Sequence, residues 1–344
     1  MRRIFLAGWI LLMSSGSLFA GSMQALEQAL ARGDRSAAVK ILRTVAEQGD
    51  AEAQAGLGSL YSYGLLGVPR DDALAVVWYR KSAEQGHPEG QYNLGVMYAA
   101  GRAVEQDAAI AADWYRLAAS QDHVSAAFNL GMLYAEGPGL TRDDAQAVIW
   151  LRKAAELGHG GAKTNLGAFY ATGRGVAKDV VEAFKWYEQA AKAGDAIAQY
   201  NVALMYANGE GVDRDEAAAI DWLQRAAAAA DPRAQFALAH HFLSGKGVPK
   251  NADAAARWML AAAERGLARA QADLGFLYDD GLGVQQDPVQ ACVWWSLAAH
   301  QLPEAGELAE AGCERLKPAQ RKAADQQIRA WQPIPMDTQR VGRR

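Results

Sequence analysis

Histidine has the widest choice of chemistry in this sequence, because it can act as a general base or bind a metal near neutral pH. Three of the histidines recur at a spacing of 36 residues: His87, His123 and His159. Equivalent residues of stacked helices lie about 10 Å apart, whereas the ligands of one zinc ion lie about 2 Å from the metal. The same position holds Asp195 and Asp231 further along the chain. We therefore predict helix N-caps at these positions and no metal site.

The other patterns give no sign of catalysis. His240 and His241 are adjacent, so on a helix they point about 100° apart and cannot hold one metal ion together. The sequence lacks S-x-x-K, G-x-S-x-G, H-E-x-x-H and G-x-x-x-x-G-K, the spacings of several serine enzymes, zinc proteases and phosphate-binding loops. We predict no catalytic residue, no bound metal and no cofactor.

The elements that position these residues are copies of one unit. Tryptophan recurs every 36 residues, an alanine lies three residues before each copy, and an aspartate or asparagine lies seven residues before it. A fixed period of this length is typical of a repeat array. The tryptophans are Trp78, Trp114, Trp150, Trp186, Trp222, Trp258 and Trp294.

Each unit predicts two helices joined by a glycine turn. In the first helix an apolar residue and a tyrosine four positions later share one face, as in Leu166 and Tyr170. Gly173 and Gly175 end that helix, and Asp179 caps the next one. One such pair cannot bury its own apolar face, so neighbouring pairs must stack. The sequence therefore predicts an all-α solenoid of seven helix pairs.

At these residues the chain resembles the Sel-1-like repeat family, a relative of the tetratricopeptide repeat. The shared pattern is A-x-x-x-L-G-x-x-Y-x-x-G-x-G-V-x-x-D-x-x-x-A-x-x-W-Y-x-x-A-A, and seven units from about residue 50 to 302 match it. The departures are local: Gly64–Gly67 carries one extra residue, Leu140 replaces a valine, and Ala239 replaces a glycine. The resemblance implies a right-handed α-solenoid that binds other proteins.

The resemblance also suggests a role for four asparagines that share one position in consecutive repeats, which we call the asparagine column. They lie one residue before the leucine position: Asn93, Asn129, Asn165 and Asn201. Asparagine is unfavourable inside a helix. In the related tetratricopeptide repeats, asparagines on the first helix bind the backbone or carboxylate of an extended peptide. The resemblance therefore implies that this column binds a partner. The alternative is that each amide bonds to the neighbouring repeat.

Aromatic residues lie one position before most of the column: Tyr92, Phe128, Tyr200 and Phe236. Aromatics at helical spacing are typical of the core between repeats. If some of them face the inner groove that the first helices of the repeats would line, they are the natural anchors for a partner. Aromatic residues dominate binding hot spots. Both interpretations stay open at this point.

The N-terminus has the pattern of a secretory signal peptide. Residues 1–22 contain Arg2 and Arg3, an apolar run over 4–13, and small residues before position 23. The run is too short to span a membrane. We expect export, by the general secretory route, to the periplasm or beyond. The formal charge of −4 is mildly acidic, which argues against a nucleic-acid partner.

The ends of the array differ from its repeats. Residues 23–49 predict a capping helix pair, 303–332 predict C-terminal capping helices, and 333–344 predict a flexible tail. Cys292 and Cys313 lie on consecutive predicted helices. Export would place them in an oxidising compartment, so they form either a disulfide that holds the C-terminal cap or two buried thiols.

These observations favour a non-catalytic periplasmic scaffold, a monomer that holds a peptide or protein of the cell envelope on its concave first-helix surface. Two alternatives belong to other classes. Some cysteine-rich relatives bind penicillin and carry a β-lactamase label, but this chain lacks their cysteine pairs and has no serine motif. The other alternative is a binder of peptidoglycan or another polysaccharide.

Overall fold

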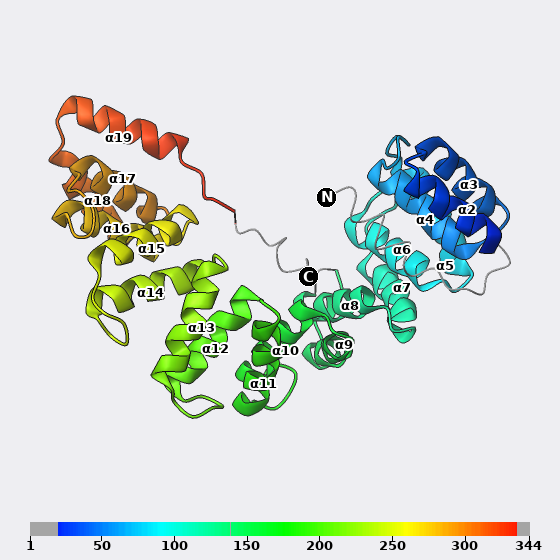
Figure 1. Cartoon of the computed structure of the whole chain (residues 1–344), viewed down its shortest axis with the longest axis horizontal. Helices are drawn as coiled ribbons and strands as arrows, with labels where there is room; N and C mark the ends of the chain where they lie inside the picture. The colour runs from blue at the N-terminus through cyan, green and yellow to red at the C-terminus, as the bar shows by residue number, and fades with distance from the viewer. Residues whose placement is uncertain (1–19, 138, 336–344) are drawn as a thin grey trace. The chain divides into compact units, whose positions relative to one another are not determined.

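The computed structural model describes residues 20–137 and 139–335, and all regular secondary structure within these ranges is helical (Figure 1). Each repeat contributes two consecutive helices, A and B. The A helices are α4 (Ala51–Tyr63), α6 (Pro88–Ala100), α8 (Val124–Glu136), α10 (Gly160–Thr172), α12 (Ala196–Asn208), α14 (Pro232–Ser244) and α16 (Ala268–Asp280). The B helices are α5 (Asp72–Glu84), α7 (Ala108–Ser120), α9 (Asp144–Glu156), α11 (Val180–Lys192), α13 (Glu216–Ala228), α15 (Ala252–Glu264) and α17 (Pro288–Ala299). The predicted all-α solenoid is confirmed.

Four further helices flank the repeats: α2 (Ala20–Ala31), α3 (Arg35–Glu47), α18 (Glu304–Glu314) and α19 (Pro318–Ala330). Residues 1–19 of the predicted signal peptide lie outside the described residues, and its last three positions, 20–22, belong to α2. The chain divides into two compact units. The first reaches Ala162 and includes Arg174–Val176, and the second contains Lys163–Gly173 and continues from Ala177. Each unit has its own buried clusters, around Leu42 and Leu57 in the first and around Met259 and Leu274 in the second.

The predicted caps of the B helices are confirmed. The Asp71 side chain accepts a hydrogen bond from the amide of Leu74 at 2.9 Å, and the equivalent residue of every other repeat accepts one in the same way. These caps satisfy amides that the helix itself leaves unpaired. The other caps are Asp107, Asp143, Asp179, Asp215, Asn251 and Asp287.

The glycine that follows the helix-A leucine allows helix B to approach closely. A Cβ on Gly58 would lie 2.6 Å from Cδ1 of Tyr79, the residue after the tryptophan. In the sixth repeat the residue after the tryptophan is Met259, and it shares a buried cluster with Ala239. The flexible methionine side chain leaves room for a methyl group there. The fifth repeat likewise has Ala203 in one buried cluster with Leu223, so both alanines at this glycine position accompany an aliphatic residue after the tryptophan.

The tryptophan column is less buried than its neighbours. Trp186 and Trp294 are buried, with 9% and 7% of their surface exposed, whereas the other five tryptophans of the column are half-buried. The residue after the tryptophan lies deeper, as Tyr79 shows at 1% exposure. The ammonium of Lys81 covers the exposed face of Trp78 at 4.3 Å from the ring centroid. The tryptophan therefore seals the edge of the interface between repeats.

A column of buried glutamines ties five A helices, α4, α6, α12, α14 and α16, to the helix that precedes each of them. The amide nitrogen of Gln199 donates to the carbonyl oxygen of Ala191 at 3.1 Å, eight residues earlier. In the sequence this glutamine lies three residues before the leucine position, and the predicted repeat pattern did not include it. The same bond is made by Gln54, Gln91, Gln235 and Gln271.

Ala229→Gln is expected to raise the free energy of unfolding by about 1 kcal/mol, the net value of one hydrogen bond. The oxygen of Gln91 accepts a bond from the Gln121 amide at 2.9 Å, but the oxygen of Gln199 is buried without a partner, because Ala229 occupies the position of Gln121. Urea denaturation of the variant measures the gain. Ala229→Glu supplies no amide donor and serves as the control, so an equal gain from both variants would contradict this account.

An ion pair joins consecutive repeats at every second junction. A basic residue in the loop after helix A reaches the acidic residue that begins the preceding helix B. We call these contacts the loop–helix pairs, and they recur every 72 residues. They are Arg102–Asp72 at 2.6 Å and Arg174–Asp144 at 2.7 Å in the first unit, and Lys246–Glu216 at 3.2 Å in the second.

The C-terminal cap is held covalently and by its tail. Cys292 of α17 and Cys313 of α18 form a disulfide. The amide of Ile334 donates to the carbonyl oxygen of Glu264 at 2.8 Å, so the beginning of the segment predicted as a flexible tail is fixed to α15. The remainder of that tail, 336–344, lies outside the described residues.

Reduction of the Cys292–Cys313 disulfide is expected to lower the free energy of unfolding by about 3 kcal/mol, the chain-entropy value for a loop of this length. Thermal unfolding with and without dithiothreitol measures the effect. The chain has two cysteines, so the double variant Cys292→Ala/Cys313→Ala must show no response to dithiothreitol. An unchanged melting temperature of the parent protein on complete reduction would contradict the expectation.

Candidate functional site

The predicted binding residues share one face of the A helices. On α12 this face consists of Ile197, Tyr200, Asn201 and Leu204, which follow helical spacing. Ile197 and Leu204 are 42% and 40% exposed, whereas Tyr200 and Asn201 are half-buried. We call this face the open stripe. The equivalent residues are Glu89, Tyr92, Asn93 and Val96 on α6, Ser125, Phe128, Asn129 and Met132 on α8, Gly161, Thr164, Asn165 and Ala168 on α10, and Arg233, Phe236, Ala237 and His240 on α14.

The asparagine column is not uniform. The amide of Asn93, 7% exposed, donates to the carbonyl oxygen of Glu89 at 2.9 Å and to its Oε1 at 2.8 Å, so it bonds within its own helix. Burial raises the pKa of Tyr115 to about 12, and a hydrogen bond with Asn129 from the next repeat partly offsets this shift. Asn165 and Asn201 are half-buried. One column thus contains contacts both within a helix and between repeats.

The flanking aromatics cover the start of the next A helix. Tyr92 stacks on His123 with ring centroids 4.5 Å apart, and Phe128 stacks on His159 at 4.1 Å. The ring of Tyr200 lies 4.5 Å from the Arg233 guanidinium. These three contacts join successive repeats, so they agree with the interpretation that the aromatics form the core between repeats. Phe236 instead meets His240 of its own helix at 4.6 Å.

The histidine column caps helices, as predicted. Nδ1 of His123 accepts a hydrogen bond from the amide of Ala126 at 3.1 Å, and Nδ1 of His159 accepts one from the amide of Ala162 at the same distance. His87 also precedes its helix but makes no cap bond with its side chain. His123 and His159 therefore cap their helices, whereas His87 occupies the same position without a cap bond.

Stability is expected to fall as the pH is lowered from 7.5 to 5.5. Burial lowers the pKa of His87 and of His159 below the ordinary value. The unfolded chain then binds protons first, at about pH 6.5, so acid favours unfolding in the interval below that pH. Urea midpoints at the two pH values measure the effect. His159→Asn keeps a capping oxygen without titrating, and a fall as large as that of the parent would contradict the role of His159.

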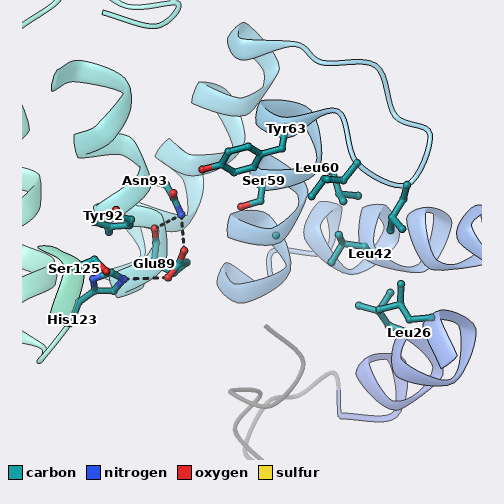
Figure 2. Close-up of a pocket in the computed structure, with 14 residues that line it drawn as sticks. Leu26, Leu42, Ser59, Leu60, Tyr63, Glu89, Tyr92, Asn93, His123 and Ser125 are labelled. Atoms are coloured by element: carbon teal, nitrogen blue, oxygen red, sulfur yellow. Dashed lines mark hydrogen bonds and ion pairs between the residues drawn. The ribbon is translucent and has the colours of Figure 1, made fainter. Parts of the chain in front are cut away.

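The first unit contains a pocket of about 310 Å³ between α2, α3, α4, α6 and the start of α8. Figure 2 shows Leu26, Leu42 and Leu60 on one side, and Glu89 and His123 on the other. Of the predicted binding residues, Tyr92 and Asn93 line this pocket, and the other six do not. The remaining lining residues are Leu30, Gly56, Ser59, Tyr63, Leu65, Leu66 and Ser125.

Sequence patterns missed the apolar half of the pocket. Leu26 and Leu30 come from the capping pair, which the repeat pattern does not describe. Leu65 and Leu66 come from the first repeat's longer turn. That extra residue was visible as a departure from the family pattern, and the leucine spacing in α2 was also visible. That these leucines line one pocket depends on how the capping pair and the first two repeats pack together, which the patterns do not describe.

The polar half of the pocket centres on Glu89. Its Oε1 accepts the hydrogen bond from Asn93, and its Oε2 lies 3.1 Å from Nε2 of His123. Burial acts to raise the pKa of Glu89, but the hydrogen bonds from His123 and Asn93 outweigh it, so the pKa is lowered. Because Nδ1 of His123 accepts from Ala126, Nε2 carries the proton of the neutral ring. Neither ring nitrogen is then left to activate a nucleophile.

No group of three or more histidine, cysteine or acidic side chains is placed to hold a metal ion within residues 20–137 and 139–335. In the same ranges, no helix has the length and apolar character needed to cross a bilayer.

Comparison with known proteins identifies the family. The Sel1 repeat model matches seven times, at residues 51–87, 88–123, 124–159, 161–195, 196–231, 232–267 and 268–301. A crystal structure of a Sel1 repeat protein from Oxalobacter formigenes is 33% identical, with a TM-score of 0.70, over 88% of this chain and 92% of that chain. A protective antigen of uropathogenic Escherichia coli displaying an SLR fold is 28% identical, with a TM-score of 0.47, over 100% of this chain and 89% of that chain. No curated protein matches. The chain belongs to the Sel1 repeat family, whose members are generally protein-interaction scaffolds.

Proposed function

We propose that this protein is an exported, non-catalytic scaffold that binds a polypeptide segment of an envelope protein on the open stripe of its A helices. The observation that carries the proposal is the pocket of about 310 Å³, which opens on residues of three successive A helices. Pockets at this size are typical of sites that bury a side chain or a small ligand. A stacked repeat array is also preorganised, so little conformational entropy is lost on binding.

The exposed residues of the open stripe support the same function in the second unit. Ile197 and Leu204 present apolar surface, and the half-buried amide of Asn201 lies between them in the sequence. An amide beside exposed apolar side chains suits a peptide, which presents both main-chain polar groups and side chains. Asn93 is already bonded within its helix, so Asn201 is the stronger candidate for contact with a main chain.

Export is part of the proposal. It rests on the signal-peptide pattern of residues 1–22 and is supported by the disulfide between Cys292 and Cys313, because disulfides persist in oxidising compartments. Cell fractionation of the native host tests it. The protein is expected in the periplasmic or secreted fraction as a monomer, and recovery in the cytosolic fraction would contradict it.

Site-specific photo-crosslinking tests the binding face. Benzoylphenylalanine replaces Tyr63, which lines the pocket and is 51% exposed, or Ile149, which lies on helix B of the third repeat and is 54% exposed. The near-equal exposure makes the two positions a matched pair. We expect a defined envelope protein to crosslink at position 63 and not at 149. Crosslinking at 149 alone would place binding on the B helices and overturn the proposal.

A further inference from the structure

We propose that the pocket of the first unit binds a lysine or arginine side chain of the partner on the Glu89 carboxylate, with an adjacent aliphatic side chain of the same segment among the leucines. The inference rests on the proposed function, since it names the chemistry of the segment that the open stripe would hold. It goes further by assigning one charge and one apolar group to that segment.

The Glu89 carboxylate retains room for a donor. Oε1 accepts one hydrogen bond, from Asn93 at 2.8 Å, and Oε2 accepts one, from His123 at 3.1 Å. Each carboxylate oxygen has two lone pairs, so one acceptor position remains on each oxygen. The Glu89 side chain is 37% exposed. It is therefore oriented by its two partners and still reachable from the pocket.

The charge of the pocket selects the sign of the ligand. Glu89 is the only acidic residue among the lining residues, and no lysine or arginine lines the pocket. The lowered pKa of Glu89 keeps its carboxylate ionised at neutral pH. Hydrogen bonds from an ammonium or guanidinium to a carboxylate are stronger than neutral ones. An acidic segment would be repelled by the Glu89 carboxylate, because no lysine or arginine lines the pocket to offset the repulsion.

The apolar half determines what lies beside the cation. Leucines from α2, α3, α4 and the turn after α4 form this half (Figure 2). Lysine and arginine carry long methylene stems, and these can lie along apolar surface while the charged head reaches a carboxylate. The leucine side chains then remain available for a neighbouring aliphatic residue. A basic residue next to leucine, isoleucine, valine or methionine is the segment that satisfies both halves.

A displayed library of random linear dodecapeptides, selected on the purified exported protein, tests the inference. Enriched sequences are expected to share a basic residue adjacent to an aliphatic one. A representative peptide is then synthesised with an acetylated N-terminus, so that its own amine cannot replace the side chain. Enrichment of sequences without a basic residue, or no enrichment at all, would overturn the proposal.

Binding of the synthesised peptide is then measured by fluorescence anisotropy. Glu89→Gln, which keeps the size of the side chain, is expected to weaken binding about tenfold to a hundredfold, the effect of losing a charge-assisted hydrogen bond. Glu52→Gln makes the same substitution at the equivalent position of α4, outside the pocket lining, and should bind like the parent. Equal binding by Glu89→Gln and the parent would sink the assignment.

Two further experiments separate the inference from effects on folding and from the proposed function. Replacing the basic residue of the peptide by glutamine needs no change in the protein, and it must weaken binding to the parent but not to Glu89→Gln. Benzoylphenylalanine at Tyr63 reports where the peptide lies. Crosslinking there by peptides without a basic residue would refute the charge assignment alone. Selected peptides that bind without crosslinking there would refute the binding face as well.

Discussion

Trp186→Ala is expected to lower the free energy of unfolding by about 3–5 kcal/mol, the range for truncation of a buried aromatic side chain. Trp186 is 9% exposed, and its removal would leave a cavity next to Ala190, which lies one helical turn later and is fully buried. Small neighbours have no long side chains with which to fill the space. Urea denaturation followed by circular dichroism at 222 nm measures the change.

Two variants show whether the effect of Trp186 comes from buried volume. Trp186→Phe retains an aromatic ring and is expected to lose less than half as much stability. Trp222→Ala removes a half-buried tryptophan whose face is covered by Arg225 at 4.8 Å, so its cost should also be smaller. If all three substitutions cost the same, the burial of Trp186 does not determine the stability of its repeat.

Gly175→Ala is expected to lower the free energy of unfolding by about 2–6 kcal/mol, the sum of two separate effects. Gly175 has φ of +66°, a conformation that costs roughly 1–3 kcal/mol for a residue with a side chain. A Cβ there would also overlap the carbonyl oxygen of Asp144, at the start of the preceding helix B. Overpacking adds about 1–3 kcal/mol, because helix and loop must move apart.

Gly33→Ala separates these two effects. Gly33 has φ of +74°, and a Cβ on it would meet no atom within 4 Å. This control contains the backbone cost without the overlap, so we expect it to lose about 1 kcal/mol, near the lower end of the range for that conformation. Thermal and urea unfolding of both variants give the comparison. Equal losses would show that the approach of Gly175 to Asp144 is not a tight contact.

The fold was predictable because one strong signal repeats seven times. Spacings within a repeat specify helix A, the turn, the cap and helix B, as Asp71 and its equivalents illustrate. Local chemistry decides such features, so each copy of the unit supports the others. The histidine caps at His123 and His159 were predictable for the same reason.

Contacts between repeats were harder to predict from one sequence. Asn93 and Asn129 occupy the same position but bond differently, because Glu89 lies four residues before Asn93 whereas Ser125 lies there in the next repeat. The pocket depends on leucines of the capping pair, which no repeat pattern covers. Position within a repeat therefore predicted the open stripe, while the identity of neighbours decides which part of it forms a pocket.

Because the loop–helix pairs recur every second repeat, they imply that the array gains or loses repeats two at a time. Removing 72 residues at any point after Asp72 within the array leaves it facing either Arg102 or its later equivalent Arg174. A deletion of 36 residues that begins between Asp72 and Arg102 instead gives Asp72 the uncharged Pro138 in the sequence. Array length should therefore change more readily in double steps, and shortened designs are best cut at 72-residue intervals.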